Sequence, residues 1–500
     1  MHYLSTRDTS IKLTAAQAIV QGLARDGGLF TPETLPEVSM DFISELCGLS
    51  YCDRAAKIMK LFLEEFSAEE LDVFCREAYG APAFDHPDTA PVYRLEEGLS
   101  FLELWHGPTS AFKDMALQML PRLLTASMAK TGEKKEVCIL VATSGDTGKA
   151  ALEGFKDVEG TRILVFYPRD GVSDIQKLQM TTQEGKNVAV CAVEGDFDDT
   201  QSGVKTIFSD EKLRSELEKN GLLLSSANSI NWGRLLPQIV YYFSAYCDLI
   251  VKGDIRQGEG INFCVPTGNF GNILAGYLAR RMGLPVNKLI CASNANRVLT
   301  DFFTEGKYDR NRKLYKTISP SMDILISSNL ERLLFIASEY DDSMVSSLMS
   351  GLSEAGYYQI SDALKEKLSQ VFWGGCADDG EAMETIGRVF EKYGYLLDPH
   401  TAVAYNVYEK YKEKSDDRTH CVIVSTASPY KFCGSVLAAL GHDIGGKDGL
   451  ELFEHMKSVT GVEIPWRLKK LKDKASRFDR SVSKNDMKPV VVETLGISGR

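Results

Sequence analysis

Short apolar runs alternate with longer amphipathic segments along most of the chain. Six of these runs are rich in β-branched residues, and the segments between them have helical periodicity. They cover residues 136–142, 161–168, 187–193, 261–266, 288–293 and 420–426. Runs that are apolar at nearly every position are typical of strands buried on both faces of a parallel sheet. The pattern predicts an α/β fold with parallel sheets flanked by helices.

The first 90 residues or so show a different pattern. Residues 15–28 and 67–80 have helical periodicity and end at glycine, and residues 81–93 contain three prolines and few apolar side chains, as a linker does. We therefore expect a mostly helical N-terminal domain over residues 1–92 and a larger α/β region over residues 93–500. Mixed charges at residues 466–488 predict a solvated C-terminal helix.

Composition and charge narrow the class of protein. With 44% hydrophobic and 25% charged residues, the 500-residue chain is ordinary for a soluble globular protein. A formal net charge of −12 would repel nucleic acids and anionic membranes, so we expect neither as a partner. The 11 cysteines form no CxxC pair and the seven histidines show no metal-ligand spacing, so we expect neither disulfides nor a bound metal. The chain also shows no signal peptide and no membrane-spanning stretch, and we expect a cytoplasmic protein.

Lys113 stands among small and apolar residues, after a Gly-Pro turn and before an amphipathic run. With Ala111 and Phe112 beside it, its amine is expected to point into a partly dry pocket. Desolvation lowers the pKa of a lysine, and a neutral amine can attack a carbonyl to form a Schiff base. The alternative is an ordinary lysine at a helix start whose stem covers apolar surface, and this stretch alone does not exclude it.

Residues 143–148 follow the first apolar run and place Ser144, Asp146 and Thr147 at the start of a helix. Hydroxyl groups and free N–H groups at such a position form a site for an anion or a carboxylate. N-capping of the helix is the simpler interpretation. The loop departs from the nucleotide-binding GxxxxGK[ST] pattern, because Thr143 stands at the first glycine position and Ala150 follows the lysine.

A second glycine-containing loop follows the run at residues 261–266. Its residues are Gly268, Asn269, Phe270, Gly271 and Asn272. The two glycines let the backbone approach a ligand closely, and the next helix directs its N-terminal dipole at the loop. The loop suits a phosphate held by backbone N–H groups, although a strand, turn and helix without a ligand would have a similar sequence.

Two other segments carry weaker signals. Thr426 ends the last strand-like run, where a neutral hydroxyl could hydrogen-bond a ring nitrogen. Asn228, Asn231 and Arg234 precede another helix, and the arginine suits a forked grip on phosphate or carboxylate. A surface loop would have much the same composition. His106 is interpreted as a packing or orienting residue.

Taken together, the motifs resemble the threonine synthase family of pyridoxal-phosphate enzymes, which has the tryptophan synthase β-like fold (fold type II). Five stretches recur in the order that the family shows: HGPTSAFKDMALQ, ATSGDTGKAA, SANSINWGR, PTGNFGNILAG and STASPYKF. The stretches GLARDGGLFTPETLP and LLDPHTAVAY also match. The likeness covers nearly the full chain and is greatest to the longer bacterial and fungal branch. It implies two α/β domains with the cofactor in the cleft between them.

The resemblance also implies roles for individual residues. Lys113 would carry pyridoxal 5'-phosphate, the loop from Gly268 to Asn272 would hold the cofactor's phosphate, and Thr426 would face the pyridine nitrogen. The candidates for binding the substrate's carboxylate and phosphate are Ser144, Asp146, Thr147, Asn228, Asn231 and Arg234.

The implied reaction converts O-phospho-L-homoserine and water into L-threonine and phosphate, the last step of threonine biosynthesis. The sequence departs from common family forms at Lys149, Ser428 and Tyr430, which puts fine specificity in doubt. Two alternatives stay open, a phospholyase or dehydratase of the same fold that yields 2-oxobutyrate and a protein that has kept the fold without the chemistry. We expect a small-molecule substrate and a monomer or homodimer.

Overall fold

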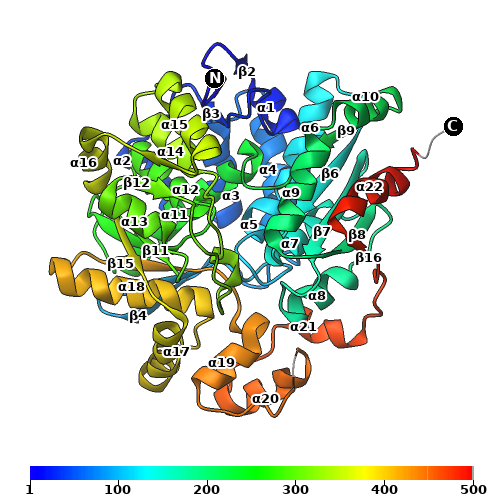
Figure 1. The fold of residues 1–500 in the computed structure, drawn as a ribbon. Helices are drawn as coiled ribbons and strands as arrows, with labels where there is room; N and C mark the ends of the chain where they lie inside the picture. Colours follow the sequence, from blue (N-terminus) through cyan, green and yellow to red (C-terminus); the bar gives the residue numbers. More distant parts are fainter. Residues whose placement is uncertain (448, 498–500) are drawn as a thin grey trace.

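Two mainly parallel sheets lie side by side in the computed structural model, which describes residues 1–447 and 449–497 (Figure 1). Helices flank both sheets, so the predicted α/β class is confirmed. All six apolar runs form strands whose ends lie within two residues of the predicted ones. The periodicity therefore located the interior of the protein correctly.

The first sheet has the strand order β16-β8-β7-β6-β9, and its strands all run parallel. They are β6 (Glu136–Ala142), β7 (Thr161–Pro168), β8 (Val188–Glu194), β9 (Leu222–Ser225) and β16 (Ser481–Ser483). The helices of this part are α6 (Leu120–Thr131), α7 (Asp146–Phe155), α8 (Asp174–Thr181), α9 (Phe197–Phe208), α10 (Glu211–Lys219) and α22 (Met487–Leu495). Residues 137–142 of β6 are all buried, as helices on both faces of a sheet require.

The second sheet has the order β14-β11-β10-β15-β5-β4, in which the edge strand β4 is antiparallel to β5 and the other pairs are parallel. Its strands are β4 (Val92–Glu96), β5 (Leu99–Glu103), β10 (Ile261–Pro266), β11 (Val286–Ser293), β14 (Phe372–Cys376) and β15 (Cys421–Ser425). Helices of this part include α5 (Asp114–Leu117), α11 (Trp232–Lys252), α12 (Gly271–Arg281), α13 (Val298–Glu305), α14 (Leu330–Ala337), α17 (Asp379–Tyr393), α18 (Pro399–Ser415), α19 (Cys433–Ala439) and α20 (Glu451–Thr460). Smaller elements are β12 (Lys307–Asp309), η1 (Pro320–Met322), α15 (Asp342–Glu354), β13 (Tyr357–Gln359), α16 (Asp362–Ser369) and η2 (Pro429–Phe432).

The N-terminal region is mostly helical, with a small antiparallel sheet in the order β2-β1-β3. It consists of β1 (Tyr3–Ser5), β2 (Lys12–Leu13), α1 (Ala15–Gln21), β3 (Phe30–Pro32), α2 (Met40–Cys47), α3 (Tyr51–Lys60) and α4 (Ala68–Tyr79). Serine side chains cap α2, α3 and α4, which fixes where each helix begins. Helices α2 and α3 pack on α11 and helix α1 packs on α6, so this region contacts helices of both sheets. The domain boundary at residue 92 stays a prediction.

The prediction of one solvated helix over residues 466–488 is wrong. The segment contains the short helices α21 (Trp466–Lys469), η3 (Lys470–Asp473) and η4 (Lys484–Asp486), and between them the strand β16, which pairs in parallel with β8. Without β16, strand β8 would lie at the edge of the sheet with unpaired backbone N–H and C=O groups. A strand can pair with these groups, whereas a helix cannot. Most of the charged side chains that suggested a helix are exposed.

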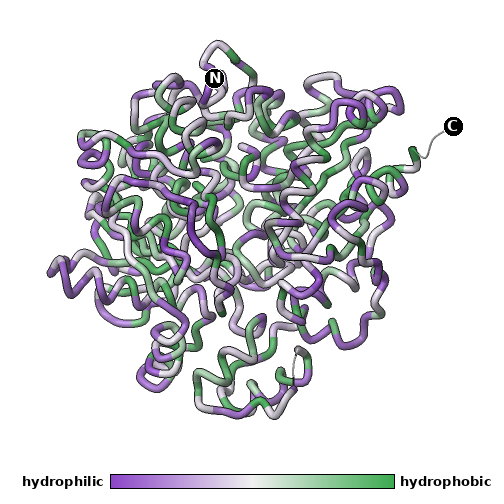
Figure 2. Tube along the Cα trace, in the orientation of Figure 1, coloured by the Kyte–Doolittle hydropathy of each residue, from purple (hydrophilic) through white to green (hydrophobic). Residues whose placement is uncertain are grey.

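Hydrophobic residues gather along the inner strands, and hydrophilic residues follow the outer helices and loops (Figure 2). The buried core includes apolar residues from both sheets and from the N-terminal helices. Among the described residues, no helix combines the length and the apolar character needed to cross a membrane.

His106 joins the linker to the second sheet. Its Nδ1 lies 3.0 Å from Asp85 Oδ1 and its Nε2 lies 2.9 Å from Glu103 Oε2, while its ring stacks on Trp105. Burial opposes a charge on the ring, but the two carboxylates raise the pKa of His106 to about 9. The position agrees with the interpretation of His106 as an orienting residue.

We expect His106→Gln to reduce the free energy of unfolding by about 2 kcal/mol more at pH 6 than at pH 9.5. A pKa raised from 6.5 to about 9 in the folded state adds stability below pH 6.5, and that stability is lost as the pH rises through 9. Chemical denaturation of both proteins at the two pH values measures the difference. A loss of stability that is the same at both pH values would contradict the proposed charge on His106.

Candidate active site

The loops singled out in the sequence all lie at the carboxyl ends of parallel strands. They follow β5, β10 and β15 in the second sheet and β6 and β9 in the first. Lys113 Nζ lies 3.9 Å from Asp146 Oδ2, and this contact links a loop of one sheet to a loop of the other. The site is therefore at the place where open α/β sheets bind ligands.

The end of β15 holds the Lys113 loop in place. The N–H of Phe112 donates to the carbonyl of Thr426 at 2.8 Å, and the N–H of Ser428 donates to the carbonyl of Ser110 at 3.1 Å. Ser110 has a φ of 58°, a left-handed conformation that reverses the chain just before the lysine. Two predicted site residues, Lys113 and Thr426, are brought together in this way.

The amine of Lys113 lies in a largely buried position, and the side chain is 11% exposed. Its Nζ donates to Ser321 Oγ at 3.3 Å. Burial lowers the pKa of Lys113 to about 8; Asp146 opposes this shift, while Arg234 and Lys431 favour it. A substantial fraction of the amine is therefore neutral near pH 7.5 and able to act as nucleophile or base.

Asp146 is the carboxylate at the centre of the site. Its Oδ1 accepts from Gln176 Nε2 at 2.8 Å and lies 2.6 Å from Lys431 Nζ. Burial alone would raise the pKa of Asp146, but Lys431 and Lys113 hold it well below its ordinary value. Asp146 is therefore ionised throughout the physiological pH range.

A polar chain leads from Lys113 to His400. Ser321 Oγ, which accepts from Lys113, lies within hydrogen-bond distance of Asp146 at 3.5 Å, and the Ser321 N–H donates to His400 Nε2 at 3.2 Å. His400 Nδ1 lies 2.8 Å from Asp398 Oδ1, and both residues are buried. Since Nε2 accepts a hydrogen bond, Nδ1 carries the ring proton and donates a hydrogen bond to Asp398. This chain fixes the η1 segment over the lysine.

The loop between β10 and α12 is suited to a phosphate. Phe270 has a φ of 64°, so the turn is made by Phe270, and its ring packs among Phe303 and Phe372 in the core. Its contribution to a ligand is therefore through its backbone. Asn272 Oδ1 accepts from Tyr241 at 2.6 Å, while its buried Nδ2 has no partner among the described residues. With the first N–H groups of α12, this leaves a cluster of free donors.

Arg234 is a buried cation without an acidic partner among the described residues. Its Nη1 donates to the carbonyl of Ala227 at 2.7 Å and its Nη2 to Thr147 Oγ1 at 3.4 Å, whereas its Nε has no partner. Desolvation lowers the pKa of Arg234 to about 10. A buried guanidinium with an unused N–H group is a strong site for an anion.

The other predicted substrate residues lie nearby but are used differently. Asn231 caps α11: its Oδ1 accepts from the Gly233 N–H at 2.9 Å, and its Nδ2 donates to the carbonyl of Ile19 at 3.0 Å. The structure therefore gives Asn231 a role in holding the loop. The buried Oδ1 of Asn228 has no partner within the part of the chain that the structure describes, so it is free for a ligand.

The loop after β6 is capped by a residue that the sequence analysis did not select. Thr143 Oγ1 accepts from the N–H groups of Gly145 and Gly148 at 3.0 and 2.8 Å. Ser144 and Thr147 are half-buried and are not needed as caps. The N-capping interpretation of Ser144, Asp146 and Thr147 is therefore wrong. Asp146 pairs instead with Lys431, and Thr147 accepts from Arg234.

Comparison with known proteins agrees with this geometry. Residues 90–427 match the family described as pyridoxal-phosphate dependent enzyme, residues 2–79 match the threonine synthase N terminus, and residues 401–491 match the threonine synthase C-terminal part. The chain belongs to the threonine synthase family of pyridoxal-phosphate dependent enzymes. This confirms the resemblance seen in the sequence.

Individual relatives support the same conclusion. Threonine synthase of Pseudomonas aeruginosa is 40% identical over 86% of this chain and 89% of that protein. Threonine synthase-like 1 of Homo sapiens is 42% identical over 88% of this chain, and the chain spans about 60% of the length of that relative. The crystal structure of PLP-bound threonine synthase from Brucella melitensis has a TM-score of 0.88 at 38% identity and covers 100% of both chains.

The residues present fit the cofactor of the threonine synthase family. Lys113 supplies an amine that is partly neutral, which the aldehyde of pyridoxal phosphate requires. The unpartnered Nδ2 of Asn272 and the start of α12 supply phosphate donors. A Cβ on Gly268 would lie 2.8 Å from the carbonyl oxygen of Ser321, so only glycine fits there without a shift of the segment over the lysine.

The three residues that depart from common threonine synthase forms make hydrogen bonds within the protein. Lys149 is buried and donates to Glu153 at 2.8 Å and to Gln183. The Tyr430 hydroxyl donates to the carbonyl of Val462 at 2.6 Å, and Ser428 Oγ accepts from the Tyr430 N–H at 3.4 Å. None of these four contacts involves Lys113 or Asp146.

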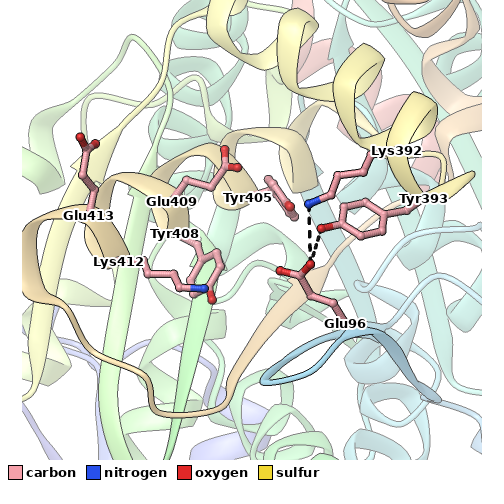
Figure 3. Close-up of a pocket in the computed structure, with 8 residues that line it drawn as sticks. All are labelled: Glu96, Lys392, Tyr393, Tyr405, Tyr408, Glu409, Lys412 and Glu413. Atoms are coloured by element: carbon pink, nitrogen blue, oxygen red, sulfur yellow. Dashed lines mark hydrogen bonds and ion pairs between the residues drawn. The ribbon is translucent and has the colours of Figure 1, made fainter.

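An open cavity of about 310 Å³ lies elsewhere, between β4 and the helices α17 and α18 (Figure 3). Tyr393 donates to Glu96 there, and Lys392 lies 3.8 Å from the same carboxylate. Lys392 and Tyr393 therefore both engage Glu96, and none of the residues that line this surface cavity belongs to the Lys113 site. It does not contribute to the chemistry described here.

Proposed function

We propose that this protein converts O-phospho-L-homoserine and water into L-threonine and phosphate. The proposal rests on the partly neutral amine of Lys113 and on Arg234, a buried cation near it whose Nε has no partner among the described residues. One group supplies a base and the other binds an anion. The named threonine synthases among the relatives support the same reaction.

Each residue of the proposed site has a task. The loop from Gly268 to Asn272 holds the cofactor's phosphate through backbone N–H groups, and Thr426 faces the ring nitrogen as a neutral partner. Arg234, with Thr147 and Asn228, binds the phosphate of the substrate. Ser144 and Asp146 line the substrate's path, and Asn231 holds the loop from β9 to α11.

When bound, pyridoxal phosphate supplies an electron sink conjugated to the substrate's Cα. The Lys113 amine takes the proton from Cα and then moves a proton at Cβ, since it lies where a base of suitable pKa is needed. Arg234 holds the phosphate group until it leaves from Cγ. Protonation at Cγ and addition of water at Cβ complete the change to threonine.

All 11 cysteines are free thiols, which fits a reducing compartment, and we propose the cytoplasm. We propose a monomer or a homodimer acting on a small molecule, without nucleic acid or membrane as partner.

Incubation of the purified protein with pyridoxal phosphate and O-phospho-L-homoserine tests the function. We expect phosphate and L-threonine in equal amounts, measured by amino-acid analysis and a phosphate assay. Phosphate with 2-oxobutyrate and ammonia as the main products would instead identify an elimination enzyme. A protein that releases no phosphate from this substrate would contradict both.

A further inference from the structure

Asp146 is shared between two lysines, and each of them approaches a different oxygen. Lys431 Nζ lies 2.6 Å from Oδ1, and Lys113 Nζ lies 3.9 Å from Oδ2. Gln176 also donates to Oδ1. The stronger ion pair is therefore made by the lysine that has had no role so far.

Lys431 is completely buried in the short helix η2, directly after the strand end that carries Thr426. Its Nζ also donates to the carbonyl of Thr109 at 3.0 Å. Because Thr109 belongs to the Lys113 loop, Lys431 bridges that loop and Asp146. Burying an ammonium group costs free energy unless it is paired, and the buried carboxylate of Asp146 supplies the opposite charge here.

A single carboxylate with only Lys113 nearby would form an ion pair with it. Such a pair would stabilise the protonated amine and remove the neutral form that attacks a carbonyl. Lys431 changes this balance in two ways, because it occupies one oxygen of Asp146 and places a second positive charge near the Lys113 amine.

We propose that Lys431 is a positioning residue that binds Asp146 and thereby keeps the Lys113 amine free to attach and release pyridoxal phosphate. The inference rests on the proposed function only in assigning the cofactor to Lys113. It does not depend on which product the enzyme forms.

The charged groups that face Lys113 come from three other elements. They are Asp146 on α7, Arg234 on α11 and Lys431 on η2. Asp398 acts at a distance, through His400 and Ser321. Removal of Lys431 leaves Asp146 with Lys113 as its nearest cation, so the Lys113 amine should stay protonated to higher pH.

The experiment measures covalent attachment of pyridoxal phosphate to the protein without substrate, as a function of pH. Borohydride trapping with peptide mapping locates the attachment, and the absorbance change gives its midpoint pH. We expect Lys431→Met and Lys431→Gln to raise the midpoint by about one unit, which is a tenfold loss of neutral amine. Lys431→Arg, which keeps the charge, should stay within a few tenths of a unit of wild type.

Lys149→Met is the matched control. Lys149 is another buried lysine in an ion pair, with Glu153 at 2.8 Å, and it is not one of the charged groups that face Lys113. Its midpoint should equal that of wild type. If Lys431→Met does not fold, the glutamine variant gives the answer, because it removes the charge and keeps an N–H donor in a side chain of similar length.

Two results would overturn the proposal: a folded Lys431→Gln variant with the wild-type midpoint, or an equal shift in Lys149→Met. Failure of the proposed function looks different. A trapped label on another lysine would contradict the assignment of Lys113, and a product other than threonine would contradict the reaction, while the effect of Lys431 on the midpoint would still be measured.

Discussion

Lys113→Ala is expected to lower threonine formation by at least about 1000-fold, because it removes both the covalent attachment point and the base. The fold should survive, since Lys113 makes one hydrogen bond, to Ser321, and one long ion-pair contact. Steady-state assays with O-phospho-L-homoserine and a thermal unfolding curve measure the two effects separately.

The control for this variant is Lys149→Met, which removes a buried lysine outside the proposed site and should keep near-normal turnover. Borohydride reduction of wild type should place the label on the peptide that contains Lys113, and the alanine variant should take up none. Retained turnover in Lys113→Ala, or a label on a different lysine, would disprove its role.

Much of the fold could be predicted because burial on both faces leaves an unmistakable pattern in the sequence. The six strands with continuous apolar runs were found with nearly correct ends. Strand β14 was missed because its sequence, FWGGC, contains two glycines that weaken any strand pattern. Strand β16 was missed because its neighbours are charged and its stability comes from pairing with β8, which is far away in sequence.

The site was predictable only where a motif is local. Lys113 and the loop from Gly268 to Asn272 each lie within one strand-loop-helix unit, so the sequence shows them directly. Ser321 was not found, because it lies in a segment without periodicity and reaches Lys113 only through the tertiary fold. His400 gave a signal only as part of a matching motif, which did not reveal its contact with Ser321.

Roles within a motif were the least predictable. Asn231 is predicted to bind the substrate, yet its amide oxygen and its amide nitrogen both form hydrogen bonds with the backbone of the protein. Lys431 stands inside a motif that was recognised, but its importance depends on the position of Asp146, about 285 residues earlier in the sequence. A sequence shows which groups are polar, but their partners are determined by packing.

Arg234→Ala is expected to lower kcat/KM for O-phospho-L-homoserine by about 100-fold and to increase the share of 2-oxobutyrate among the products. Charge-assisted hydrogen bonds from a buried guanidinium to phosphate are strong because little water competes for them. Without them the phosphate is held loosely and the site admits solvent, so the unsaturated intermediate is lost before water adds at Cβ.

The ratio of threonine to 2-oxobutyrate, measured at saturating substrate, separates this effect from weaker binding alone. Arg234→Lys is the matched variant: it keeps the charge but loses the forked geometry, so we expect an intermediate kcat/KM and a product ratio between those of wild type and the alanine variant. The guanidinium contacts Thr147 at 3.4 Å, so Thr147→Val should produce a smaller change of the same sign. If Arg234→Ala binds substrate as tightly as wild type and forms threonine alone, the substrate's phosphate is held by other residues and the closure of the site does not depend on Arg234.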